Sequence, residues 1–168
     1  MSIAYLAIDP ASTSGFAWCL DAEDQINYTS VDGLLSIPSC NPLMAFIEEI
    51  IVKKRQVIVT VEYLKGLRGA SQVEYAGNQI IKWLHKVLPS KLMTINKITP
   101  AQWQCKITKG IEGETTKDRS KLVASQWVGQ AVTSDDAADA LCILRYSLSR
   151  PLLASKPPKT SKPRQKRK

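Results

Sequence analysis

The N-terminal part of the chain has short apolar runs separated by small polar residues, which predicts strands and tight turns. Residues 3–9 form an apolar run that ends in Asp9, a pattern typical of a buried strand. The small and polar residues 11–14 suit a turn, and residues 15–20 then predict a second strand that forms a hairpin with the first. A third, weaker strand is expected between residues 25 and 31.

Beyond these strands, apolar residues recur at helical spacing in several segments, with two further strands between them. The expected helices cover residues 42–54, 71–88, 99–103, 116–128 and 135–148. The expected strands cover residues 57–62, a β-branched run that ends in Glu62, and residues 92–95. Residues 65–70 and 108–116 are expected loops, and Thr116 and Ser134 are the expected N-caps of the last two helices.

This order of elements predicts an α/β fold in one domain, residues 1–149. A meander of three antiparallel strands followed by parallel βαβ units gives a mixed five-stranded sheet with helices on both faces. Residues 150–168 are rich in Pro, Lys and Ser, so we expect a disordered tail. The tail holds eight of the 23 basic residues and no acid, and it supplies the whole formal excess charge of +8.

Composition argues against several classes of protein. No apolar run approaches the roughly 20 residues that span a bilayer, and the N-terminus lacks a signal-peptide pattern. A cytoplasmic location is therefore expected, in the host cell if the source is a phage or virus. The four cysteines are scattered without a C-x-x-C pair and His85 is the only histidine, so neither a zinc site nor a disulfide framework is expected.

Acidic residues mark the ends of the predicted elements. Asp9 and Glu62 each end a strand, and Asp136 and Asp139 lie three apart on one face of the last helix. Each acid alone has an ordinary structural explanation in a turn, a strand end or a helix N-terminus. If the two strands are parallel neighbours and the helix begins beside them, however, all four carboxylates gather in one place.

Such a cluster is typical of a metal site. Carboxylates repel one another unless cations lie between them, and hard oxygen ligands suit Mg²⁺ or Mn²⁺. Two such ions about 3.5–4 Å apart can clamp a phosphodiester. The joint pattern therefore predicts a metal-dependent nuclease.

Three segments resemble the RuvC family of Holliday-junction resolvases, which have an RNase H-like fold. They are Ala-Ile-Asp-Pro-Ala-Ser-Thr-Ser-Gly-Phe-Ala-Trp from Ala7, Val-Thr-Val-Glu ending at Glu62, and Asp-Ala-Ala-Asp-Ala-Leu from Asp136. The resemblance covers residues 3–148 in the same order and spacing. The third segment is the most specific, because sugar-kinase and chaperone ATPases begin much like the first. The short chain and basic tail are most similar to the small phage or viral branch.

The resemblance implies a homodimer that binds four-way DNA junctions and nicks two opposed strands, leaving 5′-phosphate and 3′-hydroxyl ends. It also implies two Mg²⁺ ions per active site, for which Mn²⁺ substitutes, and no nucleotide cofactor. The four metal-ligand positions fall on Asp9, Glu62, Asp136 and Asp139. Asp135 competes for the third of them because it lies four residues before Asp139, although the Asp-Ala-Ala-Asp spacing favours Asp136. Family members usually carry glycine at the position of Ala11, a change that is tolerated if the turn needs no positive φ.

The basic residues around the site are less sharply assigned. Lys106 and Lys117 are the nearest matches to the essential basic residues of the family, and Lys109 and Lys121 are rivals for these positions. Lys65, Arg68 and Arg119 are expected to hold phosphates beside the cut, contacts that give affinity without sequence information. The alternative for Lys117, Arg119 and Lys121 is a solvated helix face.

Aromatic residues leave further alternatives open. Tyr63 opens the loop in which bacterial family members carry an aromatic that probes the junction. The four tryptophans are expected to pack in the core rather than stack on bases. Two other functions also fit the sequence: a nuclease for branched DNA or replication forks in general, and a junction-binding protein without catalytic activity.

Overall fold

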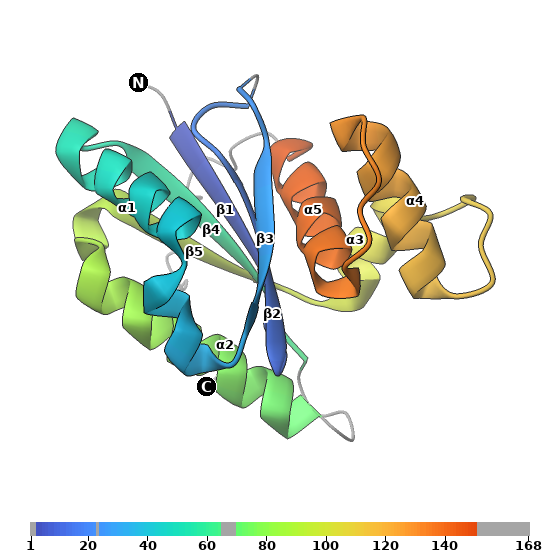
Figure 1. The fold of residues 1–168 in the computed structure, drawn as a ribbon, viewed down its shortest axis with the longest axis horizontal. Helices are drawn as coiled ribbons and strands as arrows, with labels where there is room; N and C mark the ends of the chain where they lie inside the picture. Colours follow the sequence, from blue (N-terminus) through green and yellow to red (C-terminus); the bar gives the residue numbers. More distant parts are fainter. Residues whose placement is uncertain (1–2, 23, 65–69, 151–168) are drawn as a thin grey trace, which may run out of the picture.

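The computed structural model describes residues 3–22, 24–64 and 70–150, and the elements within these ranges form a sheet with helices on both faces (Figure 1). The strands are β1 (Ile3–Asp9), β2 (Thr13–Cys19), β3 (Asn27–Asp32), β4 (Gln56–Glu62) and β5 (Met93–Ile98). The α-helices are α1 (Asn41–Lys53), α2 (Ala70–Val87), α3 (Pro100–Ile107), α4 (Thr116–Val128) and α5 (Asp135–Leu148). Two short 3₁₀ helices, η1 (Leu34–Ser39) and η2 (Ser90–Leu92), complete the order.

The five strands lie in the order β3-β2-β1-β4-β5. β1 pairs antiparallel with β2, and β2 with β3, whereas β4 lies parallel to both β1 and β5. The crossovers through α1 and α2 permit this parallel pairing, which no tight turn can provide. The mixed sheet predicted from the order of elements is therefore confirmed.

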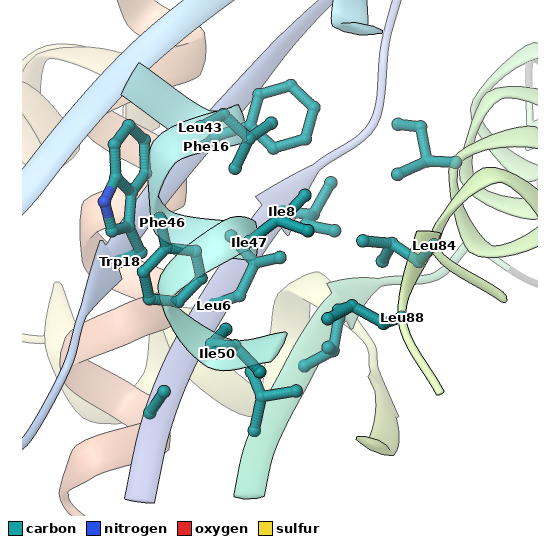
Figure 2. Close-up of a cluster of buried hydrophobic side chains, with 14 of the residues drawn as sticks. Leu6, Ile8, Phe16, Trp18, Leu43, Phe46, Ile47, Ile50, Leu84 and Leu88 are labelled. Carbon is teal, nitrogen blue, oxygen red and sulfur yellow. The ribbon is translucent and has the colours of Figure 1, made fainter. Parts of the chain in front are cut away.

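Side chains of the sheet alternate between two hydrophobic cores, because successive residues of a strand point to opposite faces. The first core lies between the sheet and the helices α1 and α2 (Figure 2). Its members include Leu6, Ile8, Phe16, Trp18, Leu43, Phe46, Ile47, Ile50, Leu84 and Leu88. The second core lies under α3, α4 and α5 and includes Ala7, Ala17, Trp103, Val123, Ala138, Leu141 and Tyr146.

Helix α5 packs closely on the centre of the sheet. Small residues meet at this contact, with Ala7 and Ala17 on the strands and Ala137 and Ala140 on the helix all buried. Near the C-terminal end of α5, the hydroxyl group of Ser147 forms a buried hydrogen bond of 2.9 Å with the hydroxyl group of Thr60 on β4. The helix is thereby fixed along its length, and its N-terminal end reaches the strand ends that carry Asp9 and Glu62.

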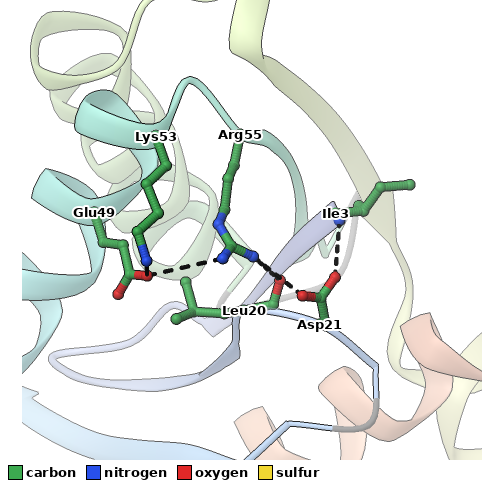
Figure 3. A network of polar contacts seen from close by, with 6 residues as sticks. All are labelled: Ile3, Leu20, Asp21, Glu49, Lys53 and Arg55. Carbon is green, nitrogen blue, oxygen red and sulfur yellow. Dashed lines mark hydrogen bonds and ion pairs between the residues drawn. The ribbon is translucent and has the colours of Figure 1, made fainter. Parts of the chain in front are cut away.

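An ion-pair network joins the elements at the opposite end of β1 (Figure 3). Arg55 donates a hydrogen bond of 3.1 Å to Asp21, and Asp21 also accepts one of 3.2 Å from the backbone N–H of Ile3. Glu49 of α1 lies 3.9 Å from the same guanidinium. These contacts stabilise the sheet far from the acidic strand ends, so they provide a reference for substitutions near them.

The sequence located most elements but misplaced some boundaries. The cap of α4 is Thr115 instead of Thr116: its hydroxyl accepts from the N–H of Asp118, whose carboxylate accepts from the N–H of Thr115 in return. Strand β5 and helix α3 run further than expected, and η1 was not predicted. The expected loop at Lys65 and Arg68 and the tail beyond Arg150 lie outside the described residues. Within the described ranges, no helix combines the length and apolar character that crossing a membrane requires.

Candidate active site

Asp9 and Glu62 lie at the ends of neighbouring parallel strands, on the same face of the sheet. The β1–β4 register runs to Ile8 opposite Val61, so the two acids are the next residues on each strand. Ile8 and Val61 point into the first core. Strand alternation therefore turns Asp9 and Glu62 to the opposite face, which α3 and α5 cover.

Helix α5 brings a second pair of acids to this place. Asp9 of β1 pairs with Gly15 of the neighbouring strand β2. A Cβ on Gly15 would lie 1.9 Å from the main-chain oxygen of Asp136. The N-terminus of α5 thus rests directly on the strand beside Asp9. Asp139 lies one turn further along the helix, and its Oδ1 is buried with no hydrogen-bond partner in the part of the chain that the structure describes.

The carboxylates influence one another's ionisation. Burial, followed by the negative charges of Glu62, Asp139 and Asp136, raises the pKa of Asp9 well above its usual range. Burial also raises the pKa of Glu62, to about 7. The pKa values of Asp136 and Asp139 are likewise raised, chiefly by burial. Each acid therefore holds its proton more tightly than in water, and a cation that compensates the charges would reverse this.

Trp103 of α3 holds the Glu62 side chain in place. Its indole Nε1 donates a hydrogen bond of 2.6 Å to Glu62 Oε2, and the tryptophan is almost fully buried. This bond lowers the pKa of Glu62 and partly offsets the effect of burial. The contact was not expected from the sequence, which indicated only that the tryptophans pack in the core; Trp18 and Trp103 are indeed buried.

Among the described residues, Lys117 is the cation whose charge acts on all four acids. It lies in the first turn of α4, and its charge lowers the pKa of Asp9, Glu62, Asp136 and Asp139 alike. Its Nζ lies 3.4 Å from Asp135 Oδ2. Lys121, one turn later on α4, pairs with the other oxygen of Asp135 at 2.6 Å.

The other candidate cations lie elsewhere. Lys106 is exposed on α3, with its Nζ 5.6 Å from the ring centroid of Tyr146, seven residues past Asp139 on α5. Lys109 is exposed in the turn after α3. Arg119 donates to the backbone oxygen of Thr115 at 3.3 Å, a contact within its own helix. Lys117 alone of the lysines proposed from the sequence therefore lies within the influence of all four acids, and Lys65 and Arg68 are outside the described residues.

Tyr63 follows Glu62 directly and is fixed against α2. Its hydroxyl donates to Glu74 Oε1 at 2.8 Å, and its N–H donates to the backbone oxygen of Ile98. The Nζ of Lys97 on β5 lies 4.9 Å from the centroid of its ring. Lys97 pairs with Val61, whose side chain points into the first core, and its Nζ donates to Asn78 Oδ1 of α2 at 3.5 Å, so it lies on the face of the sheet opposite to the acids.

The carboxylate oxygens of the four acids suit a hard divalent cation, although these side chains do not lie in a compact group. In residues 3–22, 24–64 and 70–150, no three acidic, histidine or cysteine side chains lie close enough to hold a metal ion as they stand. Bare carboxylates repel one another, so a bound cation would be needed to draw them together. Two observations fit a cation here: the buried Asp139 oxygen that has no hydrogen-bond partner among the described residues, and four acids whose pKa values are all raised. Oxygen ligands of this kind are those that Mg²⁺ and Mn²⁺ prefer.

Two solved structures of Thermus thermophilus RuvC are similar to this chain. One, RuvC in complex with a Holliday junction substrate, has a TM-score of 0.55 and 15% sequence identity, and the match covers 85% of this chain and 91% of that one. The other, RuvC alone, has a TM-score of 0.52 and 18% identity, with 85% and 92% covered. No protein-family model matches the sequence, and no curated protein matches it either. The RNase H-like fold of RuvC, expected from the three segments, is confirmed.

Proposed function

We propose that this chain, which has the fold of RuvC, is a metal-dependent endonuclease that resolves four-way DNA junctions by paired nicks. The observation that carries the proposal is the meeting of Asp9, Glu62 and the N-terminus of α5 at one end of the sheet, with Asp136 seated on Gly15. A fold can serve many functions, so the proposal rests on this site. The similar RuvC structure that contains a Holliday junction substrate supports the choice of DNA.

The four acids would hold two Mg²⁺ ions, and Mn²⁺ would substitute. When bound, the cations supply the charge neutralisation and Lewis acidity that phosphodiester hydrolysis requires. Asp139 offers a buried oxygen that no other residue in the described part of the chain hydrogen-bonds, and Trp103 orients Glu62 through the 2.6 Å hydrogen bond. Lys117 would contact a phosphate oxygen beside the cut, since its positive charge already lowers the pKa of all four acids.

The products and assembly follow from the same proposal. Attack of water on the phosphorus with departure of the 3′ oxygen leaves a 5′-phosphate and a 3′-hydroxyl. Because one site cuts one strand, paired nicks at opposed positions require two sites, and a homodimer provides them by symmetry. Resealing of the nicked product by a DNA ligase tests the ends, and analytical ultracentrifugation with and without junction tests the dimer.

The decisive experiment is cleavage of a four-way junction in Mg²⁺ by the wild type, Asp9→Asn and Asp136→Asn. We expect the wild type to cut and each variant to lose at least about a hundredfold in rate, since metal ligands are removed. Full activity in either variant refutes the assigned site. Parallel reactions on three-way and linear duplexes separate a junction resolvase from a general branched-DNA nuclease, and binding without cleavage by the wild type would instead indicate a junction-binding protein.

A further inference from the structure

Two helices begin beside the candidate site, and one acid joins them. Asp135 is the first residue of α5, and Lys117 and Lys121 lie one turn apart on the same face of α4. Each carboxylate oxygen of Asp135 has its own lysine: Oδ2 lies 3.4 Å from Lys117 and Oδ1 lies 2.6 Å from Lys121. Asp135 therefore pairs with cations of α4, whereas Asp136, the next residue, has no ion pair among the described residues.

The position of Lys117 is unfavourable for its own helix. It lies in the first turn of α4, where the helix dipole repels a positive charge. The capping box of Thr115 and Asp118 already secures this helix start, so Lys117 is not needed there for capping. An acid from another element offsets the unfavourable charge, and Asp135 fills that role. The same acid is favoured in the first turn of α5 for the opposite electrostatic reason.

We propose that Asp135 is a positioning residue, which holds the Lys117 ammonium beside the four carboxylates and is not itself a metal ligand. The inference rests on the proposed nuclease function and decides between Asp135 and Asp136 for the third ligand position. Lys121 occupies the second oxygen of Asp135 and fixes the orientation of the carboxylate. Without Asp135, the flexible Lys117 side chain would leave the site and contact the DNA phosphate less often.

The test compares Asp135→Asn, Asp135→Glu, Lys117→Gln and the double variant Asp135→Asn/Lys117→Gln in junction cleavage. We expect Asp135→Asn to lower kcat about tenfold, with KM changed less than about threefold, as for other groups that orient a functional residue. Asp135→Glu restores most of the rate because it keeps the ion pair. Adding Asp135→Asn to Lys117→Gln causes no further loss, since both act through one ammonium. Additive losses would overturn the proposal.

Two measurements do not depend on cleavage. Mn²⁺ binding without DNA, followed by the EPR signal of the free ion, should weaken by less than about threefold in Asp135→Asn and by more than about tenfold in Asp136→Asn. Equal loss in both variants would make Asp135 a ligand. In NMR, the side-chain ammonium signal of Lys117, assigned by its loss in Lys117→Gln, should be visible in the wild type through protection by the ion pair and vanish in Asp135→Asn. An unchanged signal also overturns the proposal.

The matched control is Glu49→Gln, which removes an ion pair with Lys53 at the other end of the sheet. Its carboxylate is exposed to a similar degree, 31% against 36% for Asp135. It should leave cleavage, Mn²⁺ binding and the Lys117 signal unchanged. If the wild type cuts no branched DNA, the proposed function fails, but the Mn²⁺ and NMR comparisons still decide whether Asp135 holds Lys117.

Discussion

Gly15 and Asp136 are in such close contact that the strand has no room for a side chain. A Cβ on Gly15 would lie 1.9 Å from the main-chain oxygen of Asp136 and 2.4 Å from its carbonyl carbon. Because Gly15 pairs with Asp9, this contact sets the distance between the acid that ends β1 and the acids that begin α5. The relative position of the two halves of the site therefore depends on the absence of one methyl group.

Gly15→Ala should damage the site and the fold together. The clash is with backbone, so α5 must shift, and we expect the free energy of unfolding to fall by about 1–3 kcal/mol. The cleavage rate of the folded variant should also fall, because displacement of catalytic groups by about 1 Å costs on the order of a hundredfold in rate. This decrease is larger than the loss of folded protein alone would cause. Denaturant unfolding and junction cleavage at a temperature where the variant is folded measure the two effects.

The control for this substitution is Gly77→Ala in α2. There the added Cβ would lie 3.3 Å from Pro10 Cγ, a side-chain atom that can shift slightly. The gain in helix propensity, up to about 1 kcal/mol, should offset the tight contact, so stability changes little. Equal behaviour of the two variants would show that the Gly15 contact has no special importance.

The metal-free protein should lose stability as the pH rises from about 4.5 to about 7. Burial raises the pKa of Glu62 from 4.5 to about 7, so in this window the folded state binds a proton that the unfolded chain has released. The resulting stability is fully present below pH 4.5 and lost above about 7, a change of about 3 kcal/mol for this group. Denaturant unfolding in EDTA at several pH values measures it.

Glu62→Gln identifies the source of this pH dependence. The amide does not titrate, so the variant should show a clearly smaller decline, with the remainder due to Asp9, Asp136 and Asp139, whose pKa values are also raised. Glu49→Gln, at the other end of the sheet, should keep the decline of the wild type. The same decline in all three proteins would rule out Glu62 as its cause.

Mg²⁺ should stabilise the wild type and have little effect on Asp9→Asn. A cation that binds only the folded state at about a hundred times its Kd adds about 2.7 kcal/mol to the free energy of unfolding. Without metal at pH 8, Asp9→Asn should itself be more stable than the wild type, because burial and the neighbouring acids raise the pKa of Asp9 in the fold, and the amide does not titrate. Thermal melting with Mg²⁺ or EDTA tests both statements, and an equal response to Mg²⁺ in the two proteins would contradict the assigned ligand.

Removal of residues 151–168 should weaken DNA binding at low salt while leaving the nuclease site intact. The segment contains seven basic residues and no acid. Each phosphate that they neutralise adds close to one unit to the slope of log K against log salt for duplex DNA. Gel-shift titrations at several salt concentrations should give a shallower slope for the truncated chain, and unchanged affinity would refute the role of the tail.

The local features of the site were predictable from the sequence because they depend on neighbouring residues. The strands ending at Asp9 and Glu62 and the helix Asp135–Leu148 match the structure, since alternation and helical spacing are properties of short segments. The condition under which alanine is tolerated at position 11 is met, because among the described residues other than glycine only Lys54 has a positive φ.

Contacts between distant segments were not predictable in this way. Spacing cannot tell which of several lysines approaches the acids, and only the packing of α4 on α5 distinguishes Lys117 from Lys106. A glycine inside an apolar strand was a signal for close backbone approach, but the sequence did not identify the approaching atom as the oxygen of Asp136.

The hydrogen bond from Trp103 to Glu62 gives the molecule an optical reporter of its own. The excited state of an indole is strongly polarised, so its emission depends on the charge next to its N–H. Loss of a proton from Glu62, or the arrival of a cation beside it, would change the field at a buried fluorophore only 2.6 Å away. With Trp18, Trp83 and Trp127 replaced by Phe, the fluorescence of the remaining tryptophan would report the state of the site in real time, without an added label.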